Sequence, residues 1–375
     1  MTRDQTGSNQ VTSPVTNATT TGMTGGGFYN ANSEPQWMAI EAVLDWLKNA
    51  VLEVPLDGKA PVTLADFGCS EGRNSIAVMS HALNTLLPRT DKPIQTVHSD
   101  LPTNDFSKLL QALRQDGVSV FDSHRVYSSV VGGSMFDQLL PPQSVHIATT
   151  FNAIGFLSEM PVSTLPGYIL PNGPSASGQN GYVSEQDRAT FSSLAKQDVA
   201  SFLTARAHEL VPGGKLLVQV FGGSEKGRTC DGIYDLLNDA VLAFVETGEI
   251  SKETYERYYQ PVYMRTENEL TAAASDKDYA SSEMFTLERS MTYEVPVPFV
   301  EQYERYGDIE AYVDAYVDFF RAFTEAVLRN ALPPTPSREQ LVEHIFGMAK
   351  DILRQSPERY PFRYVAVAML LTRKG

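Results

Sequence analysis

The residues best suited to chemistry lie in segment 62–75, where an apolar run meets an acid and two glycines. Val62–Phe67 is rich in β-prone residues and has Asp66 near its end. Gly68 and Gly72 follow, with the spacing Asp-x-Gly-x-x-x-Gly. The apolar residues after Gly72 recur with helical spacing, so we predict a strand, a glycine turn and a helix. In α/β proteins such a turn is where nucleotide-like ligands bind.

This turn lacks the marks of two common nucleotide sites. It has no Gly-x-Gly-x-x-Gly, which disfavours a nucleotide-dependent oxidoreductase. No Lys-Ser/Thr pair closes the loop, which disfavours a triphosphate. An acid at the strand end favours an amine or a hydroxyl-bearing ligand over a phosphate. S-adenosylmethionine, with an amino group, a sulfonium and a ribose, fits this chemistry.

Composition limits the class of protein. The chain has 375 residues, 42% hydrophobic and 20% charged, which is typical of a globular protein with one large domain and an insertion, or with two domains. The net charge of -15 and the lack of a Lys/Arg run argue against a nucleic-acid partner. Two cysteines give no disulfide framework and suit a cytoplasmic location. No apolar run is long enough to cross a bilayer, so we expect no membrane partner.

The first 27 residues differ in composition from the rest. They are rich in Thr, Asn, Ser and Gly and have no apolar stretch typical of a secretory signal. We therefore predict a disordered tail over residues 1–27.

Hydrophobic periodicity predicts strands that alternate with helices. The predicted strands are 62–67, 94–99, 126–131, 145–151, 215–221 and 362–373, and the predicted helices are 35–54, 72–87, 106–115 and 190–210. This alternation indicates an α/β fold with a parallel, doubly wound sheet.

Two regions do not follow the alternation. Segment 161–181 is rich in Pro, Gly and Ser, and a long loop of this kind is often a lid or a binding loop. Segment 231–336 is mainly helical and aromatic, and a strand follows it. We interpret it as a cap inserted into a core formed by residues 28–230 and 337–375.

Several segments occur in an order and spacing typical of one enzyme family. They are Tyr29–Gln36, Asp66–Asn74, Ser99–Phe106, Gly133–Met135, Ile154–Pro161 and Glu209–Gly214. The chain resembles the SABATH family of S-adenosylmethionine-dependent carboxyl methyltransferases from about Phe28 to its C-terminus. The most specific motif is Asp100-Leu101-Pro102-x-Asn104-Asp105-Phe106. The resemblance implies a class I, Rossmann-like methyltransferase core with an inserted helical cap, and a homodimer.

The resemblance implies a set of residues that bind S-adenosylmethionine. The carboxylate of Asp100 would accept hydrogen bonds from both ribose hydroxyls, a role for which a carboxylate is well shaped; without the family match it would be interpreted as a turn or N-cap acid. The other implied contacts are Leu101, Ser134 and Met135 at the adenine, and Tyr29, Ser33, Asp66, Gly68, Cys69 and Asn74 at the methionine portion. We expect Cys69 to be a small buried thiol and not a nucleophile, because no His is near it in sequence.

The resemblance also implies a substrate site, with one departure. Gln36 would donate its amide to a substrate carboxylate, and Ile233 and Tyr234 would line the acyl pocket. Phe156 stands where the family usually has Trp, whose indole N–H holds the second carboxylate oxygen, and Phe has no donor. Asn152 and Tyr234 are the candidate replacements.

No metal is predicted. Some relatives bind Mg²⁺ near the lid; Asn172 matches one ligand position there, but Tyr259 occupies another.

The implied reaction is the attack of a carboxylate oxygen on the sulfonium methyl, with S-adenosylhomocysteine as the leaving group. A carboxylate, with a pKa of about 4, is already ionised at neutral pH, so no catalytic base is expected. Three alternatives stay open: N-methylation of a heteroaromatic nitrogen, O-methylation of an unusual acid, and a homologue that binds the adenosyl ligand without catalysis.

Overall fold

The computed structural model describes residues 23, 27–113 and 119–375, and its centre is a seven-stranded sheet. The strands of this sheet are β1 (Val62–Phe67), β2 (Ile94–Asp100), β3 (Val126–Gly132), β4 (Val145–Phe151), β5 (Leu210–Phe221), β8 (Phe285–Val295) and β9 (Tyr364–Arg373). Their order is β3-β2-β1-β4-β5-β9-β8. The first five strands are parallel, and β9 runs antiparallel between β5 and β8. The predicted α/β class and Rossmann-like core are confirmed.

The strand order predicts a ligand site at the carboxyl ends of the central strands β1 and β4. The chain moves outward from β1 to β2 and β3, then returns to the other side of β1 with β4, and ligands bind at such a switch point. The register pairs Phe67 with Ser99 and Asp100 with Gly132. The turns that follow β1, β2 and β3 therefore lie next to one another.

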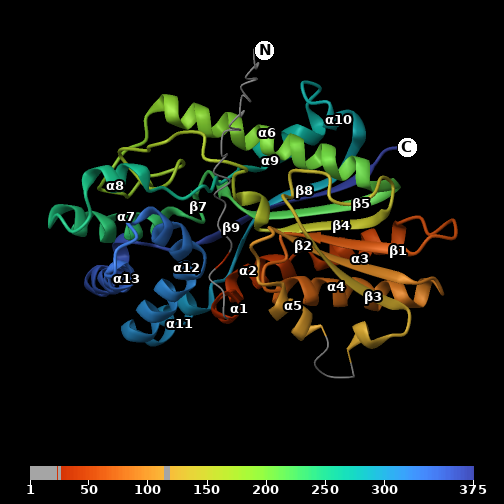
Figure 1. Ribbon diagram of the computed structural model, residues 1–375, viewed down its shortest axis with the longest axis horizontal. Helices are drawn as coiled ribbons and strands as arrows, with labels where there is room; N and C mark the ends of the chain where they lie inside the picture. The colour runs from red at the N-terminus through yellow and green to blue at the C-terminus, as the bar shows by residue number, and fades with distance from the viewer. Residues whose placement is uncertain (1–22, 24–26, 114–118) are drawn as a thin grey trace, which may run out of the picture.

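Helices cover both faces of the sheet (Figure 1). α3 (Leu44–Glu53) and α4 (Arg73–Leu86) cover one face, and α6 (Glu185–Glu209) and α9 (Glu267–Ser275) cover the other. All six residues of β1 are buried as a result, which is typical of a parallel sheet covered on both sides.

The remaining elements are short segments around the sheet and the helices of the cap. They are α1 (Phe28–Ala31), α2 (Glu34–Glu41), η1 (Leu87–Arg89), α5 (Phe106–Ala112), η2 (Val120–Asp122), η3 (Ala153–Gly155), β6 (Gly223–Ser224), β7 (Gly227–Arg228), α7 (Asp231–Glu246), α8 (Lys252–Arg257), α10 (Ser281–Met284), α11 (Pro298–Tyr306), α12 (Ile309–Ala331), α13 (Arg338–Gln355) and η4 (Pro357–Arg359).

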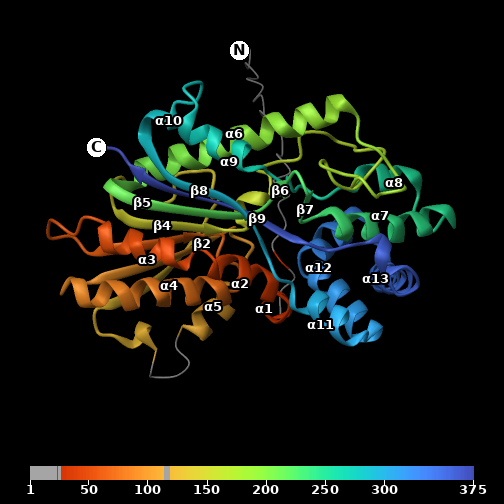
Figure 2. The same ribbon diagram turned by 180° about the vertical axis from the view of Figure 1, so that it is seen from behind.

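The cap lies beyond the carboxyl ends of the parallel strands and has a core of its own. Figures 1 and 2 show α7, α8, α11, α12 and α13 gathered on that side. Aromatic and aliphatic side chains such as Tyr316, Phe320 and Phe346 fill the space between the helices. This separate core lets the cap present a wall to the strand ends.

The structure divides the chain differently from the sequence-based boundaries. α9, α10 and β8 fall within the predicted cap 231–336, but β8 is an edge strand of the sheet and α9 packs on β8, β9 and α6. α13 falls within the predicted core segment 337–375, but it packs on α7 and α12 of the cap. β8 escapes a sequence-based search because it is an edge strand with several polar, exposed residues.

Two predicted helices also change. The predicted helix 35–54 is broken into α2 and α3, because Val43 leaves the helical conformation (φ −113°, ψ 5°). α6 begins five residues before the predicted start at 190, since the Ser184 hydroxyl accepts a hydrogen bond from the Asp187 N–H. Residues 114–115 of the predicted helix 106–115 lie outside the described residues.

The described helices were also searched for a membrane span. Across residues 23, 27–113 and 119–375, none combines the length and the apolar character that a bilayer crossing requires.

Candidate active site

A cavity of about 1210 Å³, partly open to solvent, lies between the strand ends and the cap. Residues of both parts line it. The predicted site residues among them are Gln36, Gly68, Asp100, Leu101, Ser134, Met135, Asn152, Phe156, Ile233 and Tyr234. The structure thus brings cofactor and substrate candidates into one space.

Other predicted cofactor residues do not line this cavity. Asp66 and Cys69 are buried behind it, and Asn74 is the second residue of α4. Ser33 is buried just before α2, and its hydroxyl donates to the Asn30 carbonyl at 3.4 Å. The side chain of Tyr29 lies outside the described part of the chain.

Two residues of the predicted tail 1–27 are described, and both lie near this site. Met23 lines the cavity, and the N–H of Gly27 donates to Glu71 Oε1 at 2.9 Å. The rest of that segment lies outside the described residues.

The turn after β1 requires glycine at position 68. Gly68 has φ +91°, and a Cβ there would lie 2.1 Å from the Cβ of Ala153. The N–H groups of Gly68 and Cys69 both donate to the Ser99 carbonyl, at 2.7 and 3.0 Å. The turn is therefore held against the end of β2.

Asp100 is the best oriented acid of the site. Its Oδ2 accepts from the N–H of Ser70 at 2.6 Å, and its Oδ1 accepts from the N–H of Leu101 at 2.8 Å. Burial raises the pKa of Asp100, and these two backbone hydrogen bonds oppose the rise. The Asn104 amide donates to the Ser70 carbonyl at 2.8 Å and fixes the same loop. Each carboxylate oxygen keeps a lone pair for a ligand, which suits a pair of adjacent hydroxyls.

Asp66 is a second acid near this end of the cavity. Its Oδ1 accepts a hydrogen bond from the Thr149 hydroxyl at 2.7 Å. Burial raises its pKa to about 6, although hydrogen bonds from Ser75 and Thr149 lower it. The side chain of Asp66 does not line the cavity, so its charge can influence a ligand there only from a distance.

Cys69 has the surroundings of a structural thiol. It is 4% exposed, and burial raises the pKa of its thiol. A thiolate is the reactive form of cysteine, so this environment does not favour a nucleophile.

The neighbouring wall suits an adenine ring. Leu101 and Met135 line it from the turns after β2 and β3, next to Gly133 and Ser134. The Ser134 hydroxyl accepts a hydrogen bond from the Phe136 N–H at 3.3 Å, and this contact fixes the turn after β3. An apolar slot beside an oriented carboxylate fits a nucleoside with a free ribose.

The other end of the cavity carries two side-chain amides. Gln36 on α2 is 5% exposed, and its Oε1 has no hydrogen-bond partner among the described residues. Asn152 follows β4 with φ +61°, and its Oδ1 accepts from the Tyr364 hydroxyl at 3.0 Å and from Gln219 Nε2 at 3.3 Å. Amide groups are therefore the polar partners that this end offers to an acceptor.

Apolar side chains form much of the rest of the lining, together with the polar residues Ser158 and Thr229. Phe156 packs edge-on against Phe221, with ring centroids 6.2 Å apart. Ile233 and Tyr234 come from the first turn of α7, and burial raises the pKa of Tyr234 well above its ordinary value. The sequence-based prediction does not include five apolar residues and one tyrosine of this lining: Phe221, Val262, Met264, Phe319, Phe323 and Tyr364. Nothing in the local sequence distinguishes these residues from core residues. Asn104 also lines the cavity, and its position in the most specific motif is a signal that could have identified it.

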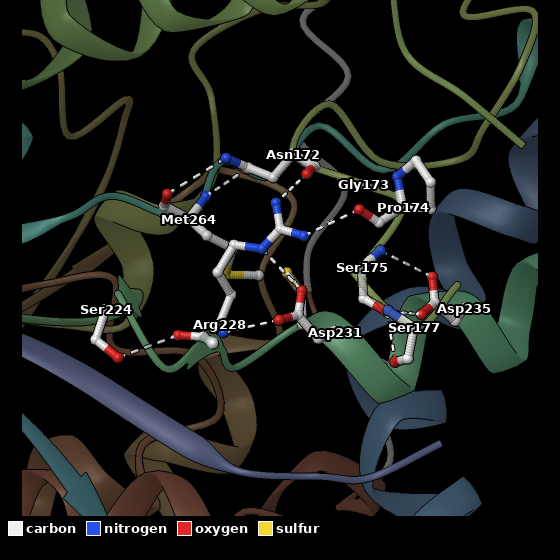
Figure 3. A network of polar contacts seen from close by, with 12 residues as sticks. Asn172, Gly173, Pro174, Ser175, Ser177, Ser224, Arg228, Asp231, Asp235 and Met264 are labelled. Carbon is white, nitrogen blue, oxygen red and sulfur yellow. Dashed lines mark hydrogen bonds and ion pairs between the residues drawn. The ribbon is translucent and has the colours of Figure 1, made fainter. Parts of the chain in front are cut away.

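The loop predicted over 161–181 is fixed to the cap by polar contacts (Figure 3). The Arg228 guanidinium donates to the carbonyls of Asn172 and Pro174 and pairs with Asp231 at 2.8 Å. The Asn172 side chain pairs with both backbone groups of Met264: its Oδ1 accepts from the N–H at 2.7 Å, and its Nδ2 donates to the carbonyl at 3.4 Å. This network, which we call the loop clasp, positions Met264 in the cavity wall.

The side chains considered as metal ligands are engaged elsewhere. The Asn172 amide bonds to Met264, and the Tyr259 hydroxyl donates to the Val162 carbonyl at 2.7 Å. Within residues 23, 27–113 and 119–375, no group of three or more His, Cys, Asp or Glu side chains is placed to hold a metal ion.

Comparison with known proteins agrees with this geometry. The family model for SAM dependent carboxyl methyltransferases matches residues 17–374. The chain is 26% identical over 262 residues to gibberellic acid methyltransferase 2 of Arabidopsis thaliana, which covers 65% of this chain and 67% of that protein. It is 28% identical over 256 residues to O-methyltransferase acrG of Aspergillus aculeatus, which covers 65% and 64%. The chain thus spans about two thirds of the length of these relatives.

A solved structure shares the fold over almost the whole chain. Loganic acid methyltransferase with SAH aligns with a TM-score of 0.77 and 22% identity, over 94% of this chain and 99% of that one. The family match over residues 17–374 makes S-adenosylmethionine the methyl donor. The chain belongs to the SABATH family of S-adenosylmethionine-dependent methyltransferases.

Proposed function

We propose that this chain methylates the carboxylate of a small organic acid and releases its methyl ester. One observation carries the proposal: the cavity joins an acid suited to a ribose with neutral amide donors, and the other lining residues described are uncharged. Of the described residues that line the cavity, none is Lys, Arg or His.

This lining suits an acceptor that needs no base. A carboxylate has a pKa of about 4 and is ionised before it binds. An N–H or phenol acceptor must lose a proton, and the described lining offers neither a His nor a Lys to take it. Asp100, the one carboxylate among the described lining residues, is assigned to the ribose in this proposal.

The residues of the chain bind and align the two partners. S-adenosylmethionine, when bound, supplies an electrophilic methyl group on a positively charged sulfur. Asp100 holds the ribose, Leu101 and Met135 cover the adenine, and the negative field of Asp66 favours the cationic ligand. Gln36 donates its amide N–H to the substrate carboxylate. Alignment of this kind accounts for roughly 7–11 kcal/mol of barrier in favourable cases.

Apolar side chains from the core and the cap exclude water from the acceptor in this proposal. Phe156, Phe221 and Ile233 surround the end where the substrate binds in this proposal. Removal of water strengthens the attraction between a carboxylate and a sulfonium. A dry, aligned pair of charges therefore takes the place of a catalytic base.

A methyl-transfer screen with isotopically labelled S-adenosylmethionine tests the proposal. Aromatic, aliphatic and dicarboxylic acids are compared with heteroaromatic amines, and mass spectrometry identifies the products. We expect labelled methyl esters. Labelled N-methyl products without esters would contradict the proposal, and so would tight binding of S-adenosylhomocysteine without any turnover.

The homodimer and the cytoplasmic location stay predictions. Light scattering of the purified chain gives its mass in solution, and a monomer would contradict the first. Fractionation of the source cells tests the second.

A further inference from the structure

The orientation of the Asn152 side chain is fixed from two sides. Its carbonyl oxygen accepts from the Tyr364 hydroxyl at 3.0 Å and from Gln219 Nε2 at 3.3 Å. A carbonyl oxygen has two lone pairs, so both are used. The two donors come from β9 and β5, which are hydrogen-bonded neighbours in the sheet. The amide is therefore held by the most buried part of the fold.

This arrangement leaves the amide nitrogen as a free donor. Within the described part of the chain, Nδ2 of Asn152 has no hydrogen-bond acceptor, and Asn152 lines the cavity. With the oxygen turned toward Tyr364 and Gln219, the nitrogen presents its two N–H bonds elsewhere. A ligand that accepts hydrogen bonds satisfies this donor.

Phe156, which directly follows η3, lines the same cavity but has no hydrogen-bond donor. Gln36 and Asn152 both line the cavity, and each carries an amide that can donate to one oxygen of a carboxylate. Amides donate hydrogen bonds to a carboxylate but carry no positive charge. They therefore do not attract a second carboxylate.

The remaining lining limits the body of the substrate. The apolar side chains at this end are Phe156, Phe221, Ile233, Val262, Met264, Phe319 and Phe323. A second carboxylate placed among them would lose its water without gaining a cation, which is costly. The chamber therefore selects an acid with one carboxylate and an uncharged, apolar body.

We infer that Asn152, held by Tyr364 and Gln219, is the residue that selects such a monocarboxylate, by donating to its second oxygen. The inference rests on the proposed carboxyl methylation and adds the class of acid and the group that recognises it.

Asn152→Asp is the sharpest variant, because it keeps the shape and replaces the N–H donors by a negative oxygen. The probes are octanoate and 3-phenylpropanoate, each with its dicarboxylate counterpart, octanedioate and 3-(4-carboxyphenyl)propanoate. Calorimetry measures their binding to the complex with S-adenosylhomocysteine, and kinetics measure KM and kcat. We expect the affinity for the better monocarboxylate to fall at least roughly 10- to 100-fold, the range for a lost hydrogen bond to a charged group. The affinity for S-adenosylhomocysteine stays within about twofold.

Two further variants separate recognition from backbone conformation. Asn152 has φ +61°, a conformation that both Asn and Gly adopt readily. If only the backbone conformation of Asn152 matters, Asn152→Gly binds the acid as tightly as the wild type. We expect instead that its affinity for the acid falls roughly tenfold. Asn84→Asp, on an exposed turn of α4, adds the same charge outside the cavity and is expected to change nothing.

The outcomes keep the inference apart from the proposed function. If wild-type chain methylates acids and Asn152→Asp binds them unchanged, the inference is wrong and the function stands. A dicarboxylate bound as tightly as its monocarboxylate also overturns the inference. If wild-type chain methylates amines and no acid, the proposed function fails first, and the inference with it.

Discussion

The two ends of the cavity are built in different ways. The cofactor end comes from the turns after β1, β2 and β3, which lie within 75 positions of one another, between residues 62 and 136. The acceptor end joins α2, η3, α7, α12 and β9, from residue 36 to residue 364. One end is thus a local product of strand–turn–helix geometry, and the other exists only when the whole chain has folded.

The chemistry of the two ends differs in the same way. The proposed cofactor end has the acids Asp66 and Asp100, and two backbone N–H groups orient Asp100. The proposed acceptor end has the neutral amides of Gln36 and Asn152. In our proposal the acids favour a cationic nucleoside and the amides determine the acceptor.

Asp100→Ala is expected to have the largest effect. Two charge-assisted hydrogen bonds to the ribose are lost, so the affinity for S-adenosylhomocysteine falls at least roughly 100-fold by calorimetry. Asp278→Ala removes an exposed acid and serves as the control. Unchanged affinity in Asp100→Ala would mean that the ribose is bound elsewhere.

Gln36→Ala tests the acceptor end by itself. Loss of one amide donor raises the KM for the acid roughly 10-fold, while the KM for S-adenosylmethionine changes little. Initial rates with each substrate varied in turn separate the two constants. Equal increases in both would argue against contact with the acid.

Asp66→Asn is expected to raise the stability of the fold and to weaken cofactor binding. The pKa of Asp66 in the folded chain, about 6, lies above its ordinary value of 3.8. The protonated carboxyl therefore contributes to the stability of the fold. This contribution is complete below pH about 4 and is lost as the pH rises through about 6. At pH 7.5 the free energy of unfolding of the variant is therefore expected to exceed that of wild type by an amount on the order of 1–3 kcal/mol. Its melting temperature is accordingly higher, and the difference shrinks toward pH 4.

The same variant is expected to bind S-adenosylmethionine more weakly, because a negative charge near the sulfonium is lost. Thermal melts across pH and calorimetry at pH 7.5 check the two halves. A melting difference that does not depend on pH would contradict the raised pKa.

Asn172→Ala is expected to have the smallest effect on activity. It removes the two hydrogen bonds that hold the backbone of Met264 in the loop clasp. We expect a rise of a few-fold in the KM for the acid and a loss of about 1–2 kcal/mol in stability, with cofactor affinity unchanged. A matched loss of cofactor affinity would show that the loop clasp serves both ends.

What could be predicted from the sequence follows the same division. β1 and β4 occur at the predicted bounds, because both are buried along their whole length as parallel strands covered on both faces are. β2 and β3 end one residue later. The prediction does not include β8, an edge strand in which apolar residues are interrupted by several exposed polar ones. The break at Val43 was missed because an apolar stripe does not record a change in helix direction.

The site shows the same limit. Asp100 and Met135 sit in short motifs, so their place in the cavity was predicted. Tyr364 contacts Asn152 across 212 positions, and Phe319 is one aromatic among many on α12. Only the packed cap distinguishes such residues from ordinary core.

A crystal structure of the chain with S-adenosylhomocysteine and a bound monocarboxylate tests the central claim most directly. The account expects both ribose hydroxyls on the carboxylate of Asp100 and the acid between the amides of Gln36 and Asn152, with the thioether sulfur facing it. A nucleoside bound away from Asp100, or an acid held outside the capped chamber, would contradict it.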